Sequence, residues 1–151
     1  MEFENVDISI SWHEEPILRS NVTITGDEKV ISVFFKNGRY HSSQDIVTLE
    51  EPVKFIVATG NDAKYPELFH YAVSKGAKFT VVFEKAGGMG GLLAAKYRGW
   101  AHSQESGIVV FEIIDVAGRL HYGVYAPLDK TEKGDGIIVE GNSPLIVEVE
   151  I

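Results

Sequence analysis

Apolar and polar residues alternate with a period of two along much of the chain. Near the N-terminus, Ile8, Ile10 and Trp12 fall on one face of an extended segment, with Ser9 and Ser11 on the other. Alternation of this kind is typical of strands with one buried face. The same pattern, or an unbroken apolar run, predicts further strands over residues 18–24, 30–35, 53–58, 79–83, 107–114, 119–126, 137–140 and 145–151.

Short turn motifs separate several of these predicted strands. Asn37-Gly38 is a strong hairpin signal, because a type I′ turn needs positive φ at both central positions. A return strand is then expected to start near Arg39 and Tyr40. Residues 116–118 predict a second hairpin, and residues 141–144 predict a third that pairs the last two strands.

Residues 62–76 interrupt the alternation and predict a helix. Leu68, Phe69, Ala72 and Val73 recur at helical spacing along this segment. Pro66 suits the first helical position, where no backbone N–H is needed, and Gly76 is suited to end the helix. We therefore expect one short helix over about residues 66–75.

Together these patterns predict a mainly β protein. The expected fold is an antiparallel β-sandwich or β-barrel of roughly nine or ten strands with one short helix. A parallel sheet is not expected, because crossover helices are missing between most of the predicted strands. With 151 residues and no linker, the chain predicts a single β-rich domain over residues 1–151.

Composition narrows the class of protein. The chain contains no cysteine, which excludes a disulfide scaffold, a thiolate zinc site and a cysteine nucleophile among these residues. Its net charge of −8 argues against nucleic-acid and membrane partners. The first fifteen residues carry no Lys or Arg, unlike a signal peptide, and no apolar run is long enough for a membrane helix. We therefore expect a cytoplasmic protein.

The charge is unevenly distributed along the sequence. Residues 64–98 contain six basic and two acidic residues, a net charge of +4, whereas the rest of the chain carries −12. Such an asymmetry suits an anionic ligand, or complementary faces on neighbouring copies of the chain. A solvated surface without a partner is the alternative.

A glycine-rich segment follows the predicted strand at 79–83, and residues 92–97 after it suit either a short helix or a strand. A strand followed by bare backbone N–H groups can cradle an anion, although neither the P-loop nor the dinucleotide fingerprint is present. A mobile hairpin tip is the alternative. Residues 97–102 add aromatic rings suited to stacking on a sugar, or to core packing. The predicted ligand-binding residues are Lys85, Gly87, Gly88, Gly90, Gly91, Lys96, Arg98 and Trp100.

Metal and nucleophile motifs are absent from the sequence. None of the five histidines forms an H-E-x-x-H or H-x-H pair, so we predict no metal site and no cofactor. If a metal were bound, His102 and His121 on neighbouring strands, joined by Glu112, are the candidate ligands, with His13 as a further one. Asp115 and Glu112 fall on opposite faces by parity and do not form an evident carboxylate pair.

These observations favour a non-enzymatic, self-associating β-domain that acts as a structural or interaction subunit, with a homo-oligomer as the expected assembly. In element order such a chain is similar to tail-tube-like subunits, which combine a small β-barrel with one flanking helix and form rings. One alternative is a binding module for a sugar or a phosphorylated small molecule, which would use the glycine segment and residues 97–102. A second alternative is a metal-assisted hydrolase.

Overall fold

The computed structural model of the chain describes the backbone of residues 5–14, 18–26, 29–35, 47–49, 54–59, 64–142 and 145–150. Side chains are described for residues 54–58, 64–119 and 121–142. The hairpin predicted at Asn37-Gly38 and its return strand lie outside these ranges. No helix within the described residues is long and apolar enough to cross a membrane.

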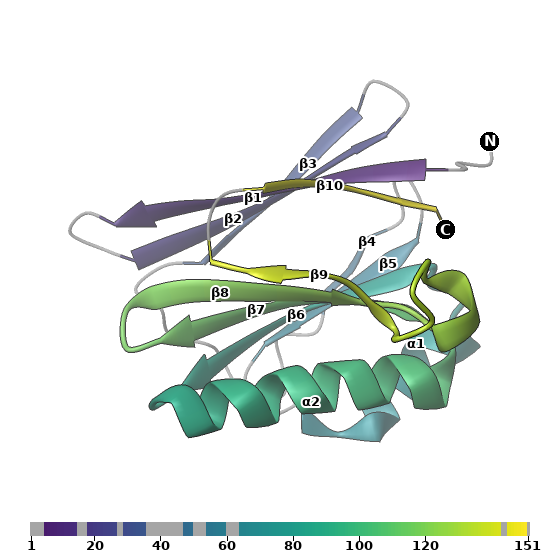
Figure 1. The fold of residues 1–151 in the computed structure, drawn as a ribbon. Coiled ribbons are helices and arrows are strands. Elements are labelled where there is room, and N and C mark those ends of the chain that lie inside the picture. Colours follow the sequence, from purple (N-terminus) through teal and green to yellow (C-terminus); the bar gives the residue numbers. More distant parts are fainter. Residues whose placement is uncertain are drawn as a thin grey trace.

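The described elements form two sheets and two α-helices (Figure 1). The four-stranded sheet has the order β10-β1-β2-β3, and the six-stranded sheet has the order β4-β5-β6-β7-β8-β9. The bounds are β1 (Asn5–Glu14), β2 (Leu18–Gly26), β3 (Lys29–Phe35), β4 (Val47–Leu49), β5 (Phe55–Thr59), α1 (Pro66–Ser74), β6 (Phe79–Ala86), α2 (Met89–Ser106), β7 (Val109–Val116), β8 (Arg119–Tyr125), β9 (Ile137–Gly141) and β10 (Leu145–Glu150).

The six-stranded sheet is mixed, with a parallel centre. Strand β5 pairs with β6 in parallel, and β6 pairs with β7 in parallel, whereas the outer pairs are antiparallel. Parallel neighbours need a crossover connection, and α1 and α2 supply the two crossovers. The predicted antiparallel sandwich or barrel with one helix is therefore wrong, and the chain has an α/β architecture.

Helix α1 lies where the sequence predicts a helix. Pro66 is its first residue, and Leu68, Phe69 and Ala72 form its buried face. Gly76 has a φ of +78°, a left-handed conformation that glycine adopts without strain. The backbone N–H of Gly76 donates to the Val73 carbonyl at 3.0 Å, which closes the last turn.

Helix α2 is much longer than the short helix or strand that the sequence predicts at residues 92–97, because its buried face is small or polar. Leu92, Ala95, Gly99, His102 and Ser103 are buried at helical spacing, but only one of them is a large apolar residue. The hydrophobic period is therefore faint, although residues 92–96 are mostly strong helix formers. The glycines at 90 and 91 belong to the first turn of this helix rather than to a loop.

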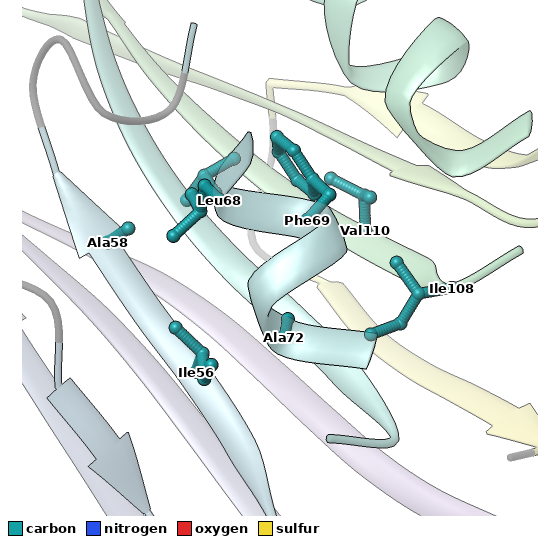
Figure 2. Close-up of a cluster of buried hydrophobic side chains, with 8 residues drawn as sticks. Ile56, Ala58, Leu68, Phe69, Ala72, Ile108 and Val110 are labelled. Carbon is teal, nitrogen blue, oxygen red and sulfur yellow. The ribbon is translucent and has the colours of Figure 1, made fainter. Parts of the chain in front are cut away.

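Both faces of the six-stranded sheet are covered. Figure 1 shows α1 and α2 on one face and the four-stranded sheet on the other. On the helix side, Leu68, Phe69 and Ala72 of α1 pack against Ile56 and Val110 (Figure 2). On the opposite side the Phe79 ring stacks on Phe55 at 4.7 Å and meets Phe111 edge-on at 5.3 Å. All eight residues of β7 are buried, as expected of a central strand.

Two hairpin predictions have different outcomes. The turn between β7 and β8 is present, with positive φ at Ala117 (50°) and Gly118 (87°). The prediction of a closing hairpin is wrong. Strand β9 pairs with β8, whereas β10 belongs to the four-stranded sheet and pairs with β1. The N-terminal and C-terminal strands therefore lie side by side, as Figure 1 shows.

Candidate functional site

Two glutamates lie side by side in the buried layer between α2 and the sheet. Glu84 is on β6 and Glu112 on β7, and each is 1 % exposed. In the parallel register Glu112 is opposite Val82, which packs in the apolar cluster against α1, so both carboxyls belong to the helix-facing side. We refer to these two residues as the glutamate pair.

Glu112 is the member of the glutamate pair whose pKa is raised. Burial raises the pKa of Glu112 well above its ordinary value, and the charge of Glu84 and a hydrogen bond with its carboxyl raise it further. One oxygen of each carboxyl, Glu84 Oε2 and Glu112 Oε1, is buried without a hydrogen-bond partner. Two carboxylates so close do not both ionise easily, so Glu112 is the carboxyl of the pair that holds a proton to higher pH.

Arg98 of α2 compensates the negative charge of Glu84. Its Nη2 donates to Glu84 Oε1 at 3.0 Å, and the arginine side chain is 34 % exposed whereas the glutamate is buried. The Nε atom of Arg98 is buried without a partner. Arg98 therefore extends from the buried pair to the surface, and its Nε–H remains able to donate a further hydrogen bond.

Tyr125, Glu140 and Lys96 continue the polar layer from the pair towards solvent. The Tyr125 hydroxyl donates to Glu140 Oε2 at 3.1 Å, and Lys96 Nζ lies 3.5 Å from the same oxygen. Burial raises the pKa of Tyr125 strongly, and the charges of Glu112 and Glu140 add to the effect. The tyrosine therefore stays protonated and serves as a hydrogen-bond donor.

Two glycines give these side chains room. A Cβ atom at Gly99 of α2 would lie 2.7 Å from Glu112 Oε2 and 3.1 Å from Tyr125 Cε2. A Cβ atom at Gly123 of β8 would collide with the Tyr125 hydroxyl and lie 2.6 Å from its Cζ. The helix backbone therefore lies directly on Glu112, and the tyrosine occupies the space above Gly123.

His102 lies in the same layer but nearer α1. Its ring stacks on Phe69 at 4.3 Å, and neither ring nitrogen has a hydrogen-bond partner. Burial lowers the pKa of His102, although the charges of Glu105 and Glu84 oppose this. It is therefore a neutral packing residue in the folded chain.

The predicted ligand-binding residues fall into three groups. Gly87, Gly88 and Gly90 have open space where a Cβ atom would be, so no close packing requires glycine there, and Lys85 is exposed. Gly91 lies against Ala86, with 3.1 Å between the two Cβ positions. Lys96 and Arg98 reach the polar layer described above. Anion binding by the glycine segment stays a prediction.

Trp100 of α2 contacts a loop of the same chain. Its Nε1 donates to the Asp135 carbonyl at 2.8 Å, so the indole fastens the loop between β8 and β9 to α2. Gln104, one turn further, donates to the Ala126 carbonyl and accepts from the Leu128 N–H. Trp100 and Gln104 therefore hold the segment between β8 and β9 against α2.

Among the described side chains, His102, His121 and Glu112 do not form the predicted metal site, and the side chain of His13 lies outside the described residues. His102 is on α2 rather than on a strand, whereas His121 is on β8, where burial and then Lys96 lower its pKa. Among the residues whose side chains are described, no three His, Asp or Glu side chains form a group that could hold a metal ion. Glu112 instead pairs with Glu84, a partner that sequence reasoning missed.

Comparison with known proteins shows similarity in structure but not in sequence. No protein family matches the sequence, and no curated protein matches it. Nit3 of Saccharomyces cerevisiae, a member of branch 10 of the nitrilase superfamily, matches with a TM-score of 0.58 and 18 % identity over 89 % of this chain and 54 % of its own. A cysteine-to-alanine mutant of a Nesterenkonia amidase from the same superfamily matches with a TM-score of 0.52 and 14 % identity, over 89 % and 55 %.

These matches correct the expected function. The fold is shared with structures of the nitrilase superfamily, one of which is an amidase. The expected non-enzymatic, self-associating subunit is therefore wrong, because it was inferred from an antiparallel β fold that the chain does not have, and the structures that share its fold include an amidase. The chain spans about half the length of the structures it matches. The predicted homo-oligomer and the anionic or sugar ligand stay predictions.

The chain also differs from these amidases in one chemical respect. A Nesterenkonia amidase structure carries the acetamide moiety of fluoroacetamide on an active-site cysteine. None of the 151 residues here is cysteine. Any chemistry that these residues perform therefore proceeds without a thiolate.

Proposed function

We propose that the chain carries a hydrolase site in which the glutamate pair activates water to cleave a carboxamide. The observation that carries this proposal is the buried, hydrogen-bonded pair of Glu84 and Glu112 beside Arg98. Paired carboxyls that share one proton combine a base and an acid at one place, as hydrolysis requires. The substrate class is taken from the amidases that share the fold.

The chemistry balances with the groups present. Glu84 accepts a proton from water as the water oxygen forms a bond with the amide carbonyl carbon. Glu112 gives its proton to the amide nitrogen as the C–N bond breaks, so that ammonia or an amine leaves. The proton gained by Glu84 then crosses the hydrogen bond to Glu112, which restores the starting state.

Arg98 has two roles in this mechanism. Its Nη2 lies 3.0 Å from Glu84 Oε1, which places a positive charge beside the carboxyl that acts as the base. Its buried Nε donor supports stabilisation of the negative charge that develops on the carbonyl oxygen. Since Glu84 and Glu112 are each 1 % exposed, a substrate must displace Arg98 or the Lys96–Glu140 ion pair to reach them.

The test is ammonia release from small aliphatic amides such as acetamide and acrylamide. We expect turnover by the wild-type chain that survives treatment with iodoacetamide, because no thiol is present. Glu112→Gln and Glu84→Gln should each lower kcat/KM by about 10²- to 10⁴-fold, the usual contribution of a positioned acid or base.

Glu67→Gln is the matched control, since Glu67 is exposed on α1 and far in sequence from the pair. It should retain wild-type turnover. Activity that iodoacetamide abolishes would come from a contaminating enzyme. No turnover of any amide by the wild type, or equal turnover by folded Glu112→Gln, would overturn the proposal.

A further inference from the structure

A buried acid–base pair needs a route by which its protons equilibrate with water. Arg98 is the partly exposed group on the Glu84 side, but a guanidinium does not give up its proton in proteins. A relay must therefore leave from Glu112, along groups that can both accept and donate.

The Tyr125 hydroxyl lies where such a group is needed. Gly123 is directly opposite Glu112 in the antiparallel ladder, so its side-chain position is the cross-strand neighbour of the acid. The Tyr125 hydroxyl fills the position that a Cβ atom at Gly123 would take. The glycine thus brings the tyrosine hydroxyl beside Glu112.

The other side of Tyr125 leads to solvent. Its hydroxyl donates to Glu140 Oε2 at 3.1 Å. Glu140 is 30 % exposed and forms an ion pair with Lys96, which is 22 % exposed. The tyrosine itself is 1 % exposed, so it lies within the buried layer and contacts the surface carboxylate of Glu140 through its hydroxyl.

We propose that Tyr125 is a proton-transfer residue that connects Glu112 with Glu140 at the surface. The role of this transfer in catalysis rests on the proposed hydrolase function. The transfer itself does not, because it occurs without substrate. The Glu112 proton passes to the tyrosine oxygen as the tyrosine proton passes to Glu140, so that one proton moves outwards and the tyrosine stays neutral. The strongly raised pKa of Tyr125 requires the two transfers to be concerted.

Infrared spectroscopy in the absence of substrate tests this relay. The C=O band of a protonated carboxylic acid shifts when its proton is replaced by deuterium, and the band of Glu112 is identified as the one missing in Glu112→Gln. After transfer into D₂O, we expect Tyr125→Phe to slow exchange of this proton at least about tenfold, equivalent to about 1.4 kcal/mol in the barrier.

The direction of the change separates a relay from a structural role. A tyrosine that only supports packing would, when its hydrogen bond is lost, loosen the layer and speed exchange. Glu140→Gln provides a second break in the same route at a partly exposed position, and it should also slow exchange. Tyr122→Phe, on the opposite face of β8, is the matched control and should leave the rate unchanged.

The relay and the hydrolase fail independently. Slower exchange in Tyr125→Phe and Glu140→Gln without amide turnover would support the relay and overturn the hydrolase. Amide turnover that depends on the glutamate pair, with unchanged or faster exchange in both variants, would overturn the relay. A wild type that lacks the Glu112 acid band would also overturn it.

Discussion

Replacing Glu112 with glutamine should change how the stability of the chain depends on pH. Glutamine has nearly the same shape as a protonated glutamic acid, and its N–H can donate to Glu84 as the acid O–H does. It carries no titrating proton. The variant therefore removes the ionisation of Glu112 while it preserves the packing beneath Gly99.

The magnitude follows from the raised pKa. The folded chain holds the Glu112 proton to a higher pH than the unfolded chain, whose glutamates release it near 4.5. The stabilising effect of the proton is complete below that pH and is lost as the pH rises to the folded pKa. Over this window the free energy of unfolding of the wild type should fall by about 1.4 kcal/mol per pH unit relative to the variant.

Thermal unfolding followed by circular dichroism, from pH 4 upwards at constant ionic strength, measures this difference. For a chain of this size the slope corresponds to a Tm change of about 3–6 °C per pH unit. His102 contributes the opposite trend, since its lowered pKa makes the folded chain more stable as the pH rises towards 6.5. That trend is common to both proteins and cancels in the difference.

Parallel pH profiles for the wild type and Glu112→Gln would refute the reasoning. They would mean that Glu112 ionises in the folded chain as readily as in the unfolded chain and does not retain its proton to higher pH. Glu67→Gln, which removes an exposed carboxyl, should give a profile close to that of the wild type.

Two glycine-based predictions test the packing of α2 and the hairpin. Gly99→Ala should lower the free energy of unfolding by about 1–3 kcal/mol in chemical denaturation, because its Cβ would lie 2.7 Å from Glu112 Oε2; Gly90→Ala, with open space at its Cβ, should instead gain up to about 1 kcal/mol. Equal effects at the two positions would contradict the close contact. Ala117→Gly should raise the free energy of unfolding by up to about 1 kcal/mol, because alanine there has a φ of 50°; Ala94→Gly, at an exposed helical position, should lower it by a similar amount. A loss of stability in Ala117→Gly would count against the type of turn assigned to this hairpin.

The part of the fold that the sequence predicts is the part where local signals agree. Pro66, the apolar spacing of Leu68, Phe69 and Ala72, and the left-handed Gly76 all favour the same helix, and α1 is present. The turn at Ala117-Gly118 is likewise local and likewise present. These signals lie within a few residues of the structure that they specify.

The architecture was missed because it depends on one helix whose apolar pattern is faint. Gly99, His102 and Ser103 lie on the buried face of α2, where apolar residues would have marked a helix. Without α2, the strands at 79–86 and 109–116 have no crossover, and an antiparallel arrangement follows. The partner of β10 is not predictable locally either, because it is the first strand of the chain.

The same helix explains why the glutamate pair was missed. Parity along β7 correctly separates Glu112 from Asp115, but only the parallel register with β6 brings Glu84 beside it. The signal that the sequence does carry is a glutamate in each of two mostly apolar segments, FTVVFE and VVFEII. A charge on a buried strand needs a partner, so a glutamate on each of two buried strands predicts that the two residues pair.

The composition of this layer is itself an argument for chemistry. Ionisable groups buried between a helix and a sheet are less stable than apolar side chains of the same volume, often by about 1–4 kcal/mol. Here Glu84, Glu112 and Arg98 leave buried polar atoms unpaired, and Gly99 and Gly123 give up packing to make room for Glu112 and Tyr125. Four elements, β6, α2, β7 and β8, thus accommodate one acid and its neighbours. Stability alone would favour leucine or methionine at these positions, so the arrangement is better explained by a group that must hold and transfer a proton.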